Sequence, residues 1–263
     1  MKLYKAYAKV NIFLKITGTR GNYHEIISRF MRVDSLYDEL SFSPNTSPEF
    51  KIIGKFSCTT EQNTIYKAYL ALLEFLNDSA KESLRNLMKK YALHVDKRIP
   101  AFAGLGGGSS DAATYLKMCN EVLHLGLSLN ELAKIGLHVG ADVPFFIYGY
   151  DSANVSGIGE VVEEFNEVLL DFEVYTPRVE ISTPKVYGIY REIFFNPINT
   201  DEVNKLKQMK SKEFMNIFSA NEANDLFKPA LQEYKKLKKY YKEGYYFSGS
   251  GSSFFRIIQK EES

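Results

Sequence analysis

Residues 100–116 read PAFAGLGGGSSDAATYL, a run of glycines followed by two serines and then by residues that favour a helix. Glycine has no Cβ and reaches positive φ easily, so the backbone N–H groups of this run can approach an anion closely. Ser109 and Ser110 fall where the helix is expected to begin, and there the unpaired N–H groups and the helix dipole attract phosphate. The stretch therefore predicts a binding site for a nucleotide polyphosphate.

Three other interpretations of the glycine run fit less well. A Walker loop needs a lysine just before the hydroxyl residue, and Gly108 stands there. A dinucleotide fingerprint spaces its glycines and follows a strand early in a βαβ unit, whereas these glycines are consecutive. A flexible linker repeats Gly and Ser without an adjoining helix, and this run leads directly into Asp111–Leu116.

The composition is that of an ordinary globular enzyme. The chain has 263 residues, enough for one large domain or two smaller ones, and 33 Lys+Arg against 32 Asp+Glu give a net charge of +1. This balance provides no overall field for nucleic acid or for a membrane surface, so any anion site must be local. Two prolines and a shift in composition at 176–184 indicate a boundary, and we predict domains 1–150 and 151–263, with the boundary within about 150–180.

The cysteines and apolar stretches bear on the compartment. Cys58 and Cys119 do not form a secreted disulfide framework, because Cys119 falls on an expected helix. Lys2, Lys5 and Lys9 interrupt the N-terminal apolar residues, and no apolar run is long enough to span a bilayer. We therefore expect a cytoplasmic protein without a membrane partner.

Hydrophobic periodicity predicts a mixture of strands and helices, hence an α+β fold. Ser128 and Glu131 form the signature of a capping box before a helix. The expected strands are 3–16, 26–36, 38–43, 93–95, 145–148 and the two sides of a glycine turn at 245–258. The expected helices are 64–76, 81–90, one that follows the glycine run, 129–138, and several that begin at Thr183–Pro184.

Two further stretches carry side chains suited to phosphoryl transfer. On a strand, Lys9 and Asn11 project from the same face, and the Lys9 ammonium can stabilise transferred charge or lower the pKa of a hydroxyl. A solvated surface lysine is the alternative. Asp142, in the sequence GADVP, follows a helix end and can accept a proton from a nucleophile. The alternative for Asp142 is a carboxylate that accepts local N–H groups in a turn.

Aromatic and small residues suggest a further binding surface. Tyr23, His24 and Phe30 offer rings and an imidazole that both donates and accepts, although each is also compatible with a core position. The turn 248–253, SGSGSS, permits close approach to a diphosphate or forms an ordinary bulged hairpin. No metal-ligand spacing surrounds His24, so the sequence assigns no residue to a metal.

The order of these motifs resembles that of the GHMP kinases, the superfamily of galactokinase, homoserine kinase and mevalonate kinase. The resemblance rests on the early Ala-Lys-x-Asn strand, the Pro-x-x-x-Gly-Leu-Gly-Gly-Gly-Ser-Ser loop and the late Gly-Ser-Gly turn. It covers nearly the whole chain and is weakest over 199–242. It implies a two-lobed α+β fold with a sheet-rich N-terminal nucleotide-binding lobe, a C-terminal α+β lobe, and an active site in the cleft between.

More narrowly, the stretches AKVNIFLKITGTRGNYHEI and GADVPFF are similar to the members that phosphorylate a tertiary hydroxyl of a cytidyl-diphosphate methylerythritol in non-mevalonate isoprenoid synthesis. The resemblance implies ATP with Mg²⁺ as cofactors, a small-molecule substrate, no nucleic-acid partner, Asp142 as base and Lys9 as its assistant. The nucleotide residues that it implies are Asn63, Lys97, Pro100, Gly104, Leu105, Gly106, Gly107, Gly108, Ser109 and Ser110. The substrate residues that it implies are Asn11, Tyr23, His24, Phe30, Tyr187, Gly249, Ser250, Gly251 and Ser252.

Some positions depart from the family's pattern. Phe102 stands in a loop entry that is usually smaller, Asn22 replaces a frequent glycine, and Tyr187 replaces a phenylalanine but can stack equally well. Asp111 lies awkwardly close to a phosphate site, so its side chain is expected to turn away from the ligand. The alternatives are another kinase of the same superfamily, such as a homoserine or mevalonate kinase, and a non-catalytic nucleotide- or RNA-binding protein.

Overall fold

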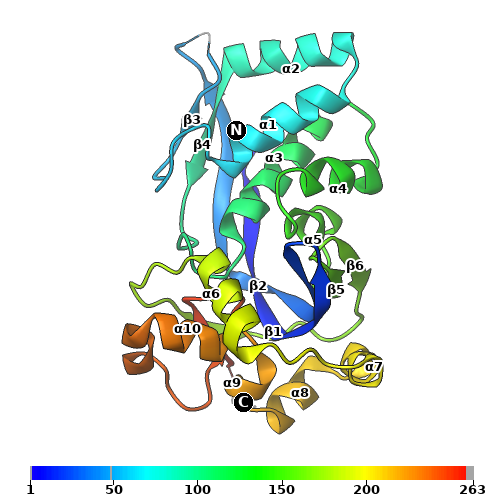
Figure 1. Ribbon diagram of the computed structural model, residues 1–263. Coiled ribbons are helices and arrows are strands. Elements are labelled where there is room, and N and C mark those ends of the chain that lie inside the picture. Colours follow the sequence, from blue (N-terminus) through cyan, green and yellow to red (C-terminus); the bar gives the residue numbers. More distant parts are fainter. Residues whose placement is uncertain (1, 48, 259–263) are drawn as a thin grey trace, which may run out of the picture. The chain divides into compact units, whose positions relative to one another are not determined.

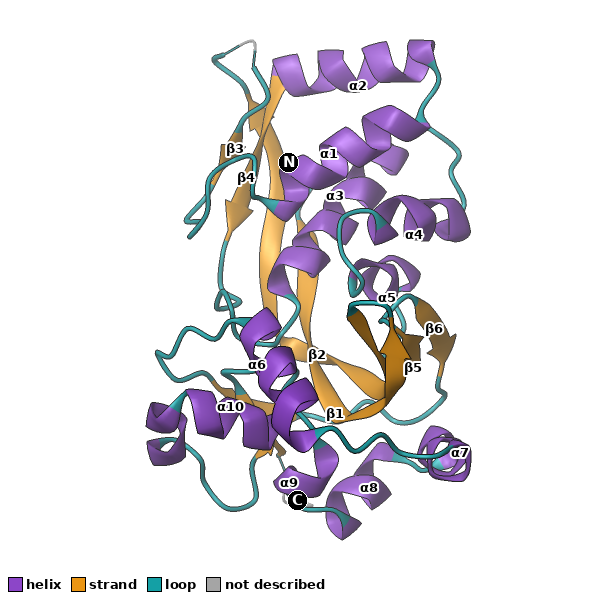
Figure 2. Ribbon diagram, viewed as in Figure 1, coloured by secondary structure: helices purple, strands orange, loops and turns teal. Residues whose placement is uncertain are grey.

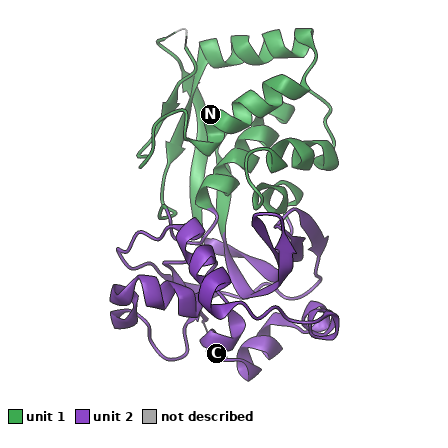
Figure 3. Cartoon of the chain, viewed as in Figure 1, with its two compact units in different colours: residues 1–8, 36–101, 107–149 green, residues 9–35, 102–106, 150–263 purple. Residues whose placement is uncertain are grey.

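The computed structural model describes residues 2–47 and 49–258. Contacts within the chain divide it into two compact units, coloured separately in Figure 3. Unit 1 comprises residues 1–8, 36–101 and 107–149, and unit 2 comprises residues 9–35, 102–106 and 150–263. One boundary falls at 149/150, close to the predicted division at 150, but segments 9–35 and 102–106 group with unit 2 rather than with the N-terminal part.

Two long strands begin the chain. Strand β1, Tyr4–Arg20, pairs with β2, Tyr23–Pro44, and Gly21 and Asn22 form the turn between them. Gly21 has φ +58°, in the left-handed region that glycine adopts without strain. Each of the two strands contributes its residues to both units, so the chain passes between the units several times.

Unit 1 contains a sheet with helices on one side of it (Figure 1). The second half of β2 pairs antiparallel with β4, Tyr91–Asp96, which pairs in parallel with β3, Ile52–Ile53. The helices of this unit are α1, Thr64–Phe75; α2, Asp78–Lys90; α3, Gly107–Val122; α4, Leu129–Leu137; and α5, Val143–Tyr148.

Side-chain caps explain where several of these helices begin. The Asn63 side chain accepts from Ile65 N at the start of α1, and the Asn77 side chain accepts from Ala80 N at the start of α2. The predicted capping box of Ser128 and Glu131 is present at α4. Helix α3 is buried almost all round from Ser110 to Cys119 and packs against α1, α4 and α5, so it forms the centre of unit 1.

Unit 2 contains the other pairings of the sheet and a second, smaller sheet (Figure 2). The first half of β2 pairs antiparallel with β5, Ser152–Gly157, which pairs with β6, Val161–Glu164. The smaller sheet has the order β7, Phe172–Tyr175; β9, Phe254–Ile257; β8, Tyr246–Phe247. The helical segments of unit 2 are α6, Thr183–Ile189; η1, Tyr190–Phe194; α7, Thr200–Gln208; α8, Ser211–Ile217; α9, Ala220–Ala223; α10, Phe227–Glu233; and η2, Lys235–Lys239.

The core of unit 2 joins segments far apart in the sequence. Leu14, Ile16 and Ile26 of the first two strands are buried with Phe227 and Phe254 in one hydrophobic cluster. Leu14 also forms a β-bridge with Asn224. The first two strands are therefore part of the hydrophobic core that the C-terminal helices cover.

Two predictions of elements were wrong, and the start of a third was placed three residues too late. The expected strand 145–148 is helix α5, because Pro144 occupies its first turn and Gly149 ends it with φ 73°, and a short apolar run does not distinguish a buried strand from a buried helix. The expected strands 26–36 and 38–43 are one continuous strand, β2. The helix expected at 81–90 begins at Asp78, since Asn77 caps it.

The remaining predictions of elements agree with the structure within a few residues, including the helix after the glycine run and the strand, glycine turn and strand near the C-terminus. Cys58 is exposed, Cys119 is buried on α3, and neither forms a disulfide. Over residues 2–47 and 49–258, no helix is both long and apolar enough to cross a membrane.

Candidate active site

Lys9 is a buried lysine at the centre of a hydrogen-bonded group in unit 2. Only 3% of the residue is exposed, so the alternative of a solvated surface lysine is wrong. Its Nζ donates to Asn11 Oδ1 at 2.6 Å and to Gly104 O at 3.1 Å, and it lies 4.4 Å from the centre of the Phe30 ring. Asn11 Nδ2 in turn donates to Ser28 Oγ at 2.9 Å. A buried ammonium needs such partners, and they fix its position.

The front of the glycine run lies directly against the late glycine turn. A Cβ on Gly104, whose φ is +73°, would fall 2.1 Å from Ser248 O, so only glycine fits there. Ser248 Oγ donates to Gly104 O at 3.0 Å, and Ser253 N donates to Ala103 O at 3.1 Å. Lys9 N donates to Leu105 O at 3.0 Å. These bonds hold residues 103–105 between Lys9 and the turn 248–253.

The late turn is anchored by its own serines and by two side chains that the sequence did not indicate, Asn224 and Thr183. Asn224 Nδ2 donates to Phe247 O at 2.9 Å and to Gly249 O at 2.8 Å. The hydroxyls of Thr183 and Ser250 are 2.6 Å apart, and Ser252 Oγ donates to Pro177 O at 3.1 Å. These hydrogen bonds hold the backbone and the serine hydroxyls of the turn in place within unit 2.

Gly249 completes the arrangement of Lys9, Asn11 and the two glycine segments. A Cβ on Gly249 would lie 3.4 Å from Asn11 Oδ1 and 3.3 Å from Gly104 O. The first strand, the front of the glycine run and the late turn thus meet within unit 2. The sequence predicted functions for all three, and the structure brings them together.

His24 provides an unused hydrogen-bonding atom beside aromatic rings. Its ring centre lies 5.1 Å from that of Tyr187 and 5.8 Å from that of Tyr190, and 8% of the residue is exposed. Burial, followed by the charge of Arg191, lowers the pKa of His24 below its ordinary value of 6.5. Within the described residues, His24 Nε2 is buried and has no hydrogen-bond partner. A buried polar atom of this kind suits a ligand.

The other predicted aromatic residues differ in exposure. Tyr23 is 64% exposed, whereas Phe30 is 2% exposed and packs against the Lys9 ammonium. Tyr187 lies on α6, where Pro184 sits in the first turn. Tyr187 and His24 are therefore adjacent, and Phe30 belongs to the surroundings of Lys9.

In unit 1, the helices α1 and α3 begin next to each other. Thr64 Oγ1 donates to Gly108 O at 2.6 Å, and a Cβ on Gly108 would lie 3.1 Å from the same hydroxyl oxygen. Thr64 follows Asn63, the cap of α1, which is 6% exposed. Ser109 and Ser110 lie in the first turn of α3, as predicted, so the positive ends of two helix dipoles share this region.

Lys97 lies beneath the first turn of α3 between two buried carboxylates. A Cβ on Gly107 would be 3.6 Å from Lys97 Nζ, which donates to Asp111 Oδ2 at 2.7 Å and to Asp38 Oδ2. Asp38 also accepts from the backbone N–H groups of Arg98 and Ile99. The prediction that Asp111 turns away from a phosphate agrees with its contact to Lys97.

The charges of this group are unequal, because two carboxylates share one ammonium. Burial raises the pKa of Asp111, and the attraction of Lys97 opposes this effect only in part. Burial lowers the pKa of Lys97, but the charges of Asp111 and Asp38 outweigh it, so that the net shift is upward. Asp111 Oδ1 is buried and has no hydrogen-bond partner in the described residues.

Asp142 lies at the N-terminus of α5 but does not cap that helix with its side chain. The preceding Gly140 is close to the first turn of α3, since a Cβ there would lie 3.8 Å from Ser109 Oγ. A loop that carries a carboxylate thus passes beside a serine of the predicted phosphate site within unit 1. The part of Asp142 in proton transfer stays a prediction.

Sequence reasoning missed several residues that support these groups. They include Ser28, Asp38, Thr64, Tyr190 and Asn224. None of them left a local signal, because each acts on a partner far away in the sequence; Asp38, for example, is followed directly by a second carboxylate, Glu39. The described residues contain no group of three or more His, Cys, Asp or Glu side chains that could hold a metal ion.

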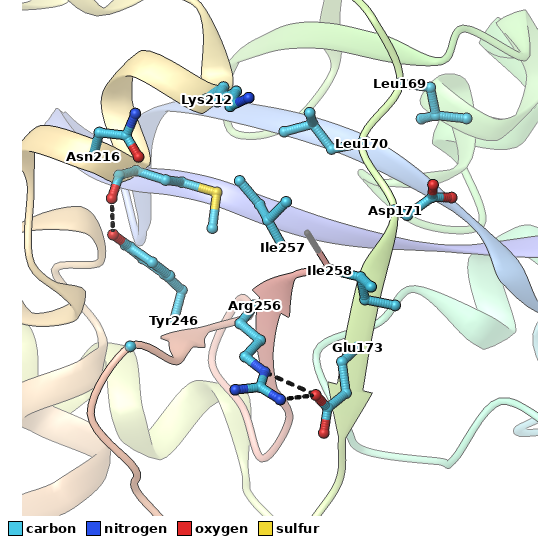
Figure 4. Close-up of a pocket in the computed structure, with 12 residues that line it drawn as sticks. Leu169, Leu170, Asp171, Glu173, Lys212, Asn216, Tyr246, Arg256, Ile257 and Ile258 are labelled. Atoms are coloured by element: carbon cyan, nitrogen blue, oxygen red, sulfur yellow. Dashed lines mark hydrogen bonds and ion pairs between the residues drawn. The ribbon is translucent and has the colours of Figure 1, made fainter. Parts of the chain in front are cut away.

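One cavity of unit 2, about 880 Å³, does not include any predicted site residue (Figure 4). It lies over β9, where Arg256 and Glu173 point toward each other and form an ion pair. Because Arg256 and Glu173 neutralise each other, this pair provides no free charge for binding a phosphate.

Comparison with known proteins identifies the family. The 4-diphosphocytidyl-2-C-methyl-D-erythritol kinase of Sulfurimonas denitrificans is 73% identical over 262 residues, which are 99% of this chain and 98% of the relative. This chain belongs to the 4-diphosphocytidyl-2-C-methyl-D-erythritol kinase family. The kinase of the same name from a Sulfurovum species is 44% identical over 96% of this chain and 97% of its own. Residues 63–150 also match the model of the GHMP kinases N terminal domain.

Solved structures agree with this family. A crystal structure of 4-(cytidine 5'-diphospho)-2C-methyl-D-erythritol kinase matches 98% of this chain and 90% of its own, with a TM-score of 0.69 and 27% identity. The mevalonate kinase of L. major in complex with R-mevalonate has a TM-score of 0.64 and 15% identity over 100% of this chain and 88% of its own, a likeness of fold alone. The α+β GHMP kinase fold is thereby confirmed, the protein is a small-molecule kinase, and ATP is its expected phosphate donor.

Proposed function

We propose that this protein transfers the γ-phosphoryl group of ATP to the 2-hydroxyl of 4-diphosphocytidyl-2-C-methyl-D-erythritol, giving the 2-phosphate and ADP in non-mevalonate isoprenoid synthesis. The observation that carries this proposal is the buried Lys9 and Asn11 pair against Gly104 and the turn 248–253, in the same unit as an unpartnered His24 nitrogen. The names of relatives that match 96–99% of the chain support the same substrate.

The acceptor hydroxyl needs a base and a compensating charge. Asp142 accepts the hydroxyl proton as the oxygen attacks the γ-phosphorus, and the bond to ADP breaks. Lys9 stabilises the negative charge that develops on the oxygens during this transfer. The burial of Lys9 supports this part, because its attraction for an anion is not weakened by bulk water.

The cytidine and diphosphate groups require recognition of a different kind. His24 hydrogen-bonds the edge of cytosine through its unused nitrogen, while Tyr187 and the exposed Tyr23 supply rings that can stack. Phe30 and Asn11 shape the surface beside Lys9. The backbone of 249–252 borders the diphosphate, and Asn224 keeps that backbone in place.

The triphosphate of ATP lies along Pro100 and residues 104–110, whose glycines expose N–H groups at the start of α3. Asn63 and Lys97 lie beside this first turn, and we place adenine there because the resemblance to the GHMP kinases implies it. Because two carboxylates engage the Lys97 ammonium, the contact of Lys97 with the nucleoside comes from its backbone or its methylene stem.

We propose that Mg²⁺ accompanies the nucleotide. This ion prefers oxygen ligands and is commonly bound by one or two carboxylates together with phosphate oxygens. The hydroxyls of Ser109 and Ser110, in the first turn of α3, are oxygen donors beside the proposed triphosphate site. When bound, the ion neutralises charge on the phosphates. The proposed compartment is the cytoplasm.

Replacement of Asp142 by asparagine tests the proposal. Purified protein with Mg-ATP and the cytidyl substrate should release ADP, and Asp142→Asn should reduce kcat by about 10²- to 10⁴-fold, because the proton then has no acceptor. ATP affinity should change little. The exposed carboxylate of Asp78 provides the matched control, Asp78→Asn, which should leave kcat unchanged. Turnover near the original rate in Asp142→Asn would remove the assignment of the base.

Another kinase of the superfamily is the alternative, and cytidine distinguishes the two. Cytidine diphosphate should compete with the substrate in the original protein and should compete more weakly in His24→Ala. Competition by homoserine or mevalonate alone would favour the alternative. Salt-dependent RNA binding without ADP release would favour a binding protein instead.

A further inference from the structure

Unit 2 contains a second cavity, of about 480 Å³, that includes none of the residues assigned to ATP or to the cytidyl substrate. Its volume is typical of small-molecule sites, which span about 300–1,000 Å³. Phe194, Phe214 and Phe218 line it, together with Ile198 and Leu206. The wall is therefore largely apolar and aromatic.

The acidic residues of this cavity are already used by partners inside the protein. Asp225 pairs with Lys15 and accepts from Ile16 N at 2.8 Å. Glu202 accepts from Asn199 N in the capping box of α7, and Glu222 accepts from Ser219 N and Oγ in that of α9. These carboxylates complete helix ends and a buried ion pair, so they are not available to hold a cation.

Two lysines of the same cavity have no such partners. The ammonium groups of Lys205 on α7 and Lys228 on α10 form no hydrogen bond or ion pair within residues 2–47 and 49–258. The positive charge of Lys228 is felt by the Glu222 carboxylate, whose pKa is lowered chiefly by its hydrogen bonds to Ser219. An aromatic wall with two uncommitted ammonium groups matches an organic anion that has an apolar body.

Two residues that line this cavity also support the proposed substrate residues. Asn224 donates to Gly249 O at 2.8 Å and to Phe247 O at 2.9 Å, so it holds the turn 248–253. Tyr190 lies edge-on to His24, with ring centres 5.8 Å apart, and its hydroxyl accepts from Asn196 N at 3.2 Å. A ligand that contacts Asn224 and Tyr190 would therefore touch the residue that holds the turn 248–253 and the ring that packs against His24.

We propose that this cavity is an effector site for a small organic anion with an aromatic or apolar body, held by Lys205 and Lys228. Its occupation restrains Asn224 and Tyr190 and thereby increases the affinity for the cytidyl substrate. The binding of the anion depends only on the cavity, whereas its effect on substrate affinity rests on the proposed function. Coupling of this kind is a difference in affinity between the free and occupied forms.

Binding is tested with 8-anilinonaphthalene-1-sulfonate, an aromatic anion whose fluorescence rises in an apolar site. The full chain should bind it saturably, and Lys205→Glu/Lys228→Glu should weaken binding at least tenfold. Lys212 and Lys236 are exposed lysines outside this cavity, so Lys212→Glu/Lys236→Glu makes the same change in net charge and should bind as the original protein does. Equal binding by the two double variants would overturn the site.

A second variant separates the cavity from general surface charge. Ile198 is half-buried in the wall, and Ile198→Trp fills the space without changing the charge. It should abolish saturable binding while thermal unfolding shows an intact fold. The neutral 1-naphthalenemethanol should compete much more weakly than naphthalene-1-sulfonate. Strong competition by the neutral compound would overturn the part assigned to the lysines.

Coupling is measured by kinetics with and without naphthalene-1-sulfonate. The KM for the cytidyl substrate should fall at least threefold while kcat stays the same, and Lys205→Glu/Lys228→Glu should lose this response but keep the basal rate. Fluorescence binding with an unchanged KM would overturn the coupling and leave the site. If the original protein shows no kinase activity with the cytidyl substrate, the proposed function is contradicted, whereas the anion site is still tested by fluorescence.

Discussion

In unit 2 the turn 248–253 is fixed against Gly104 by close backbone contact and neutral hydrogen bonds. In unit 1, by contrast, the Lys97 ammonium lies between two buried carboxylates, Asp38 and Asp111. Neutral contacts of the first kind depend on shape. Buried charges depend on every partner being present, since an uncompensated charge is costly. The two regions should therefore respond differently to substitution and to pH.

The largest effect should come from the charges of unit 1. Asp38→Asn puts an amide N–H group or a neutral oxygen against the Lys97 ammonium and disturbs the bonds from Arg98 N and Ile99 N, so it should cost about 3–5 kcal/mol of unfolding free energy. Urea unfolding measures this loss.

Asp111→Asn is the matched control, with the same chemical change beside the same lysine. Within residues 2–47 and 49–258 the Asp111 carboxylate accepts no backbone hydrogen bond and its Oδ1 has no partner. Because Lys97 also keeps Asp38, this variant should cost about 1 kcal/mol or less. Equal losses in the two variants would contradict the distinction between a backbone-anchored carboxylate and a shared one.

A smaller effect should come from the close contact in unit 2. Gly104→Ala places a methyl group 2.1 Å from Ser248 O at φ +73°, and overpacking of this kind costs about 1–3 kcal/mol in addition to the backbone strain. The KM for the cytidyl substrate should rise, because the turn 248–253 must move. Both quantities are measurable by urea unfolding and steady-state kinetics.

Gly126→Ala separates strain from crowding. Gly126 has φ +70°, close to that of Gly104, but a Cβ there meets nothing within 4 Å. This variant should show only the strain, about 1 kcal/mol, and an unchanged KM. If both alanine variants lose the same stability, the contact with Ser248 does not determine the glycine at 104.

The smallest effect should appear in the dependence of stability on pH. The folded-state pKa of His24 lies below the ordinary 6.5, so the unfolded chain takes up a proton first as the pH falls. Stability is then fully present above about pH 6.5 and decreases toward the lower folded pKa, by at most about 1.4 kcal/mol per pH unit.

Comparison with His24→Gln isolates this contribution, because glutamine does not titrate. The unfolding free energy of the original protein minus that of His24→Gln should be constant above about pH 6.5 and should fall as the pH drops below that value. Asp111 in unit 1 affects stability in the opposite direction. Its pKa is raised on folding, so its contribution to stability decreases as the pH rises. A His24→Gln curve parallel to that of the original protein at every pH would show that His24 does not titrate differently on folding.

The sequence predicted the elements with strong local signals. The capping box at Ser128 and the start of α3 after the glycines follow from a few adjacent residues, and the structure has both. The run 145–148 was misassigned because four apolar residues fit a strand or a buried helix equally well.

Residues that act through distant partners could not be predicted in this way. Asn224 holds the backbone carbonyls of Phe247 and Gly249, which lie 23 and 25 positions later in the chain. Asp38 pairs with Lys97, 59 positions away. Neither has a neighbour in sequence that indicates its role, because the contact exists only once the chain has folded. Lys9 shows the same limit, since nothing local indicates that its ammonium is buried.

The pairing of β2 with β5 has a consequence for the order of events during synthesis. Ile26 pairs with Gly157, and Leu14 bridges to Asn224, so the first hairpin leaves the ribosome more than a hundred residues before these partners exist. Its apolar face must stay unassociated meanwhile, and contacts of such long range close slowly. A nascent chain halted near residue 150 should accordingly be a substrate for chaperones, and a separately expressed 151–263 fragment should fail to fold.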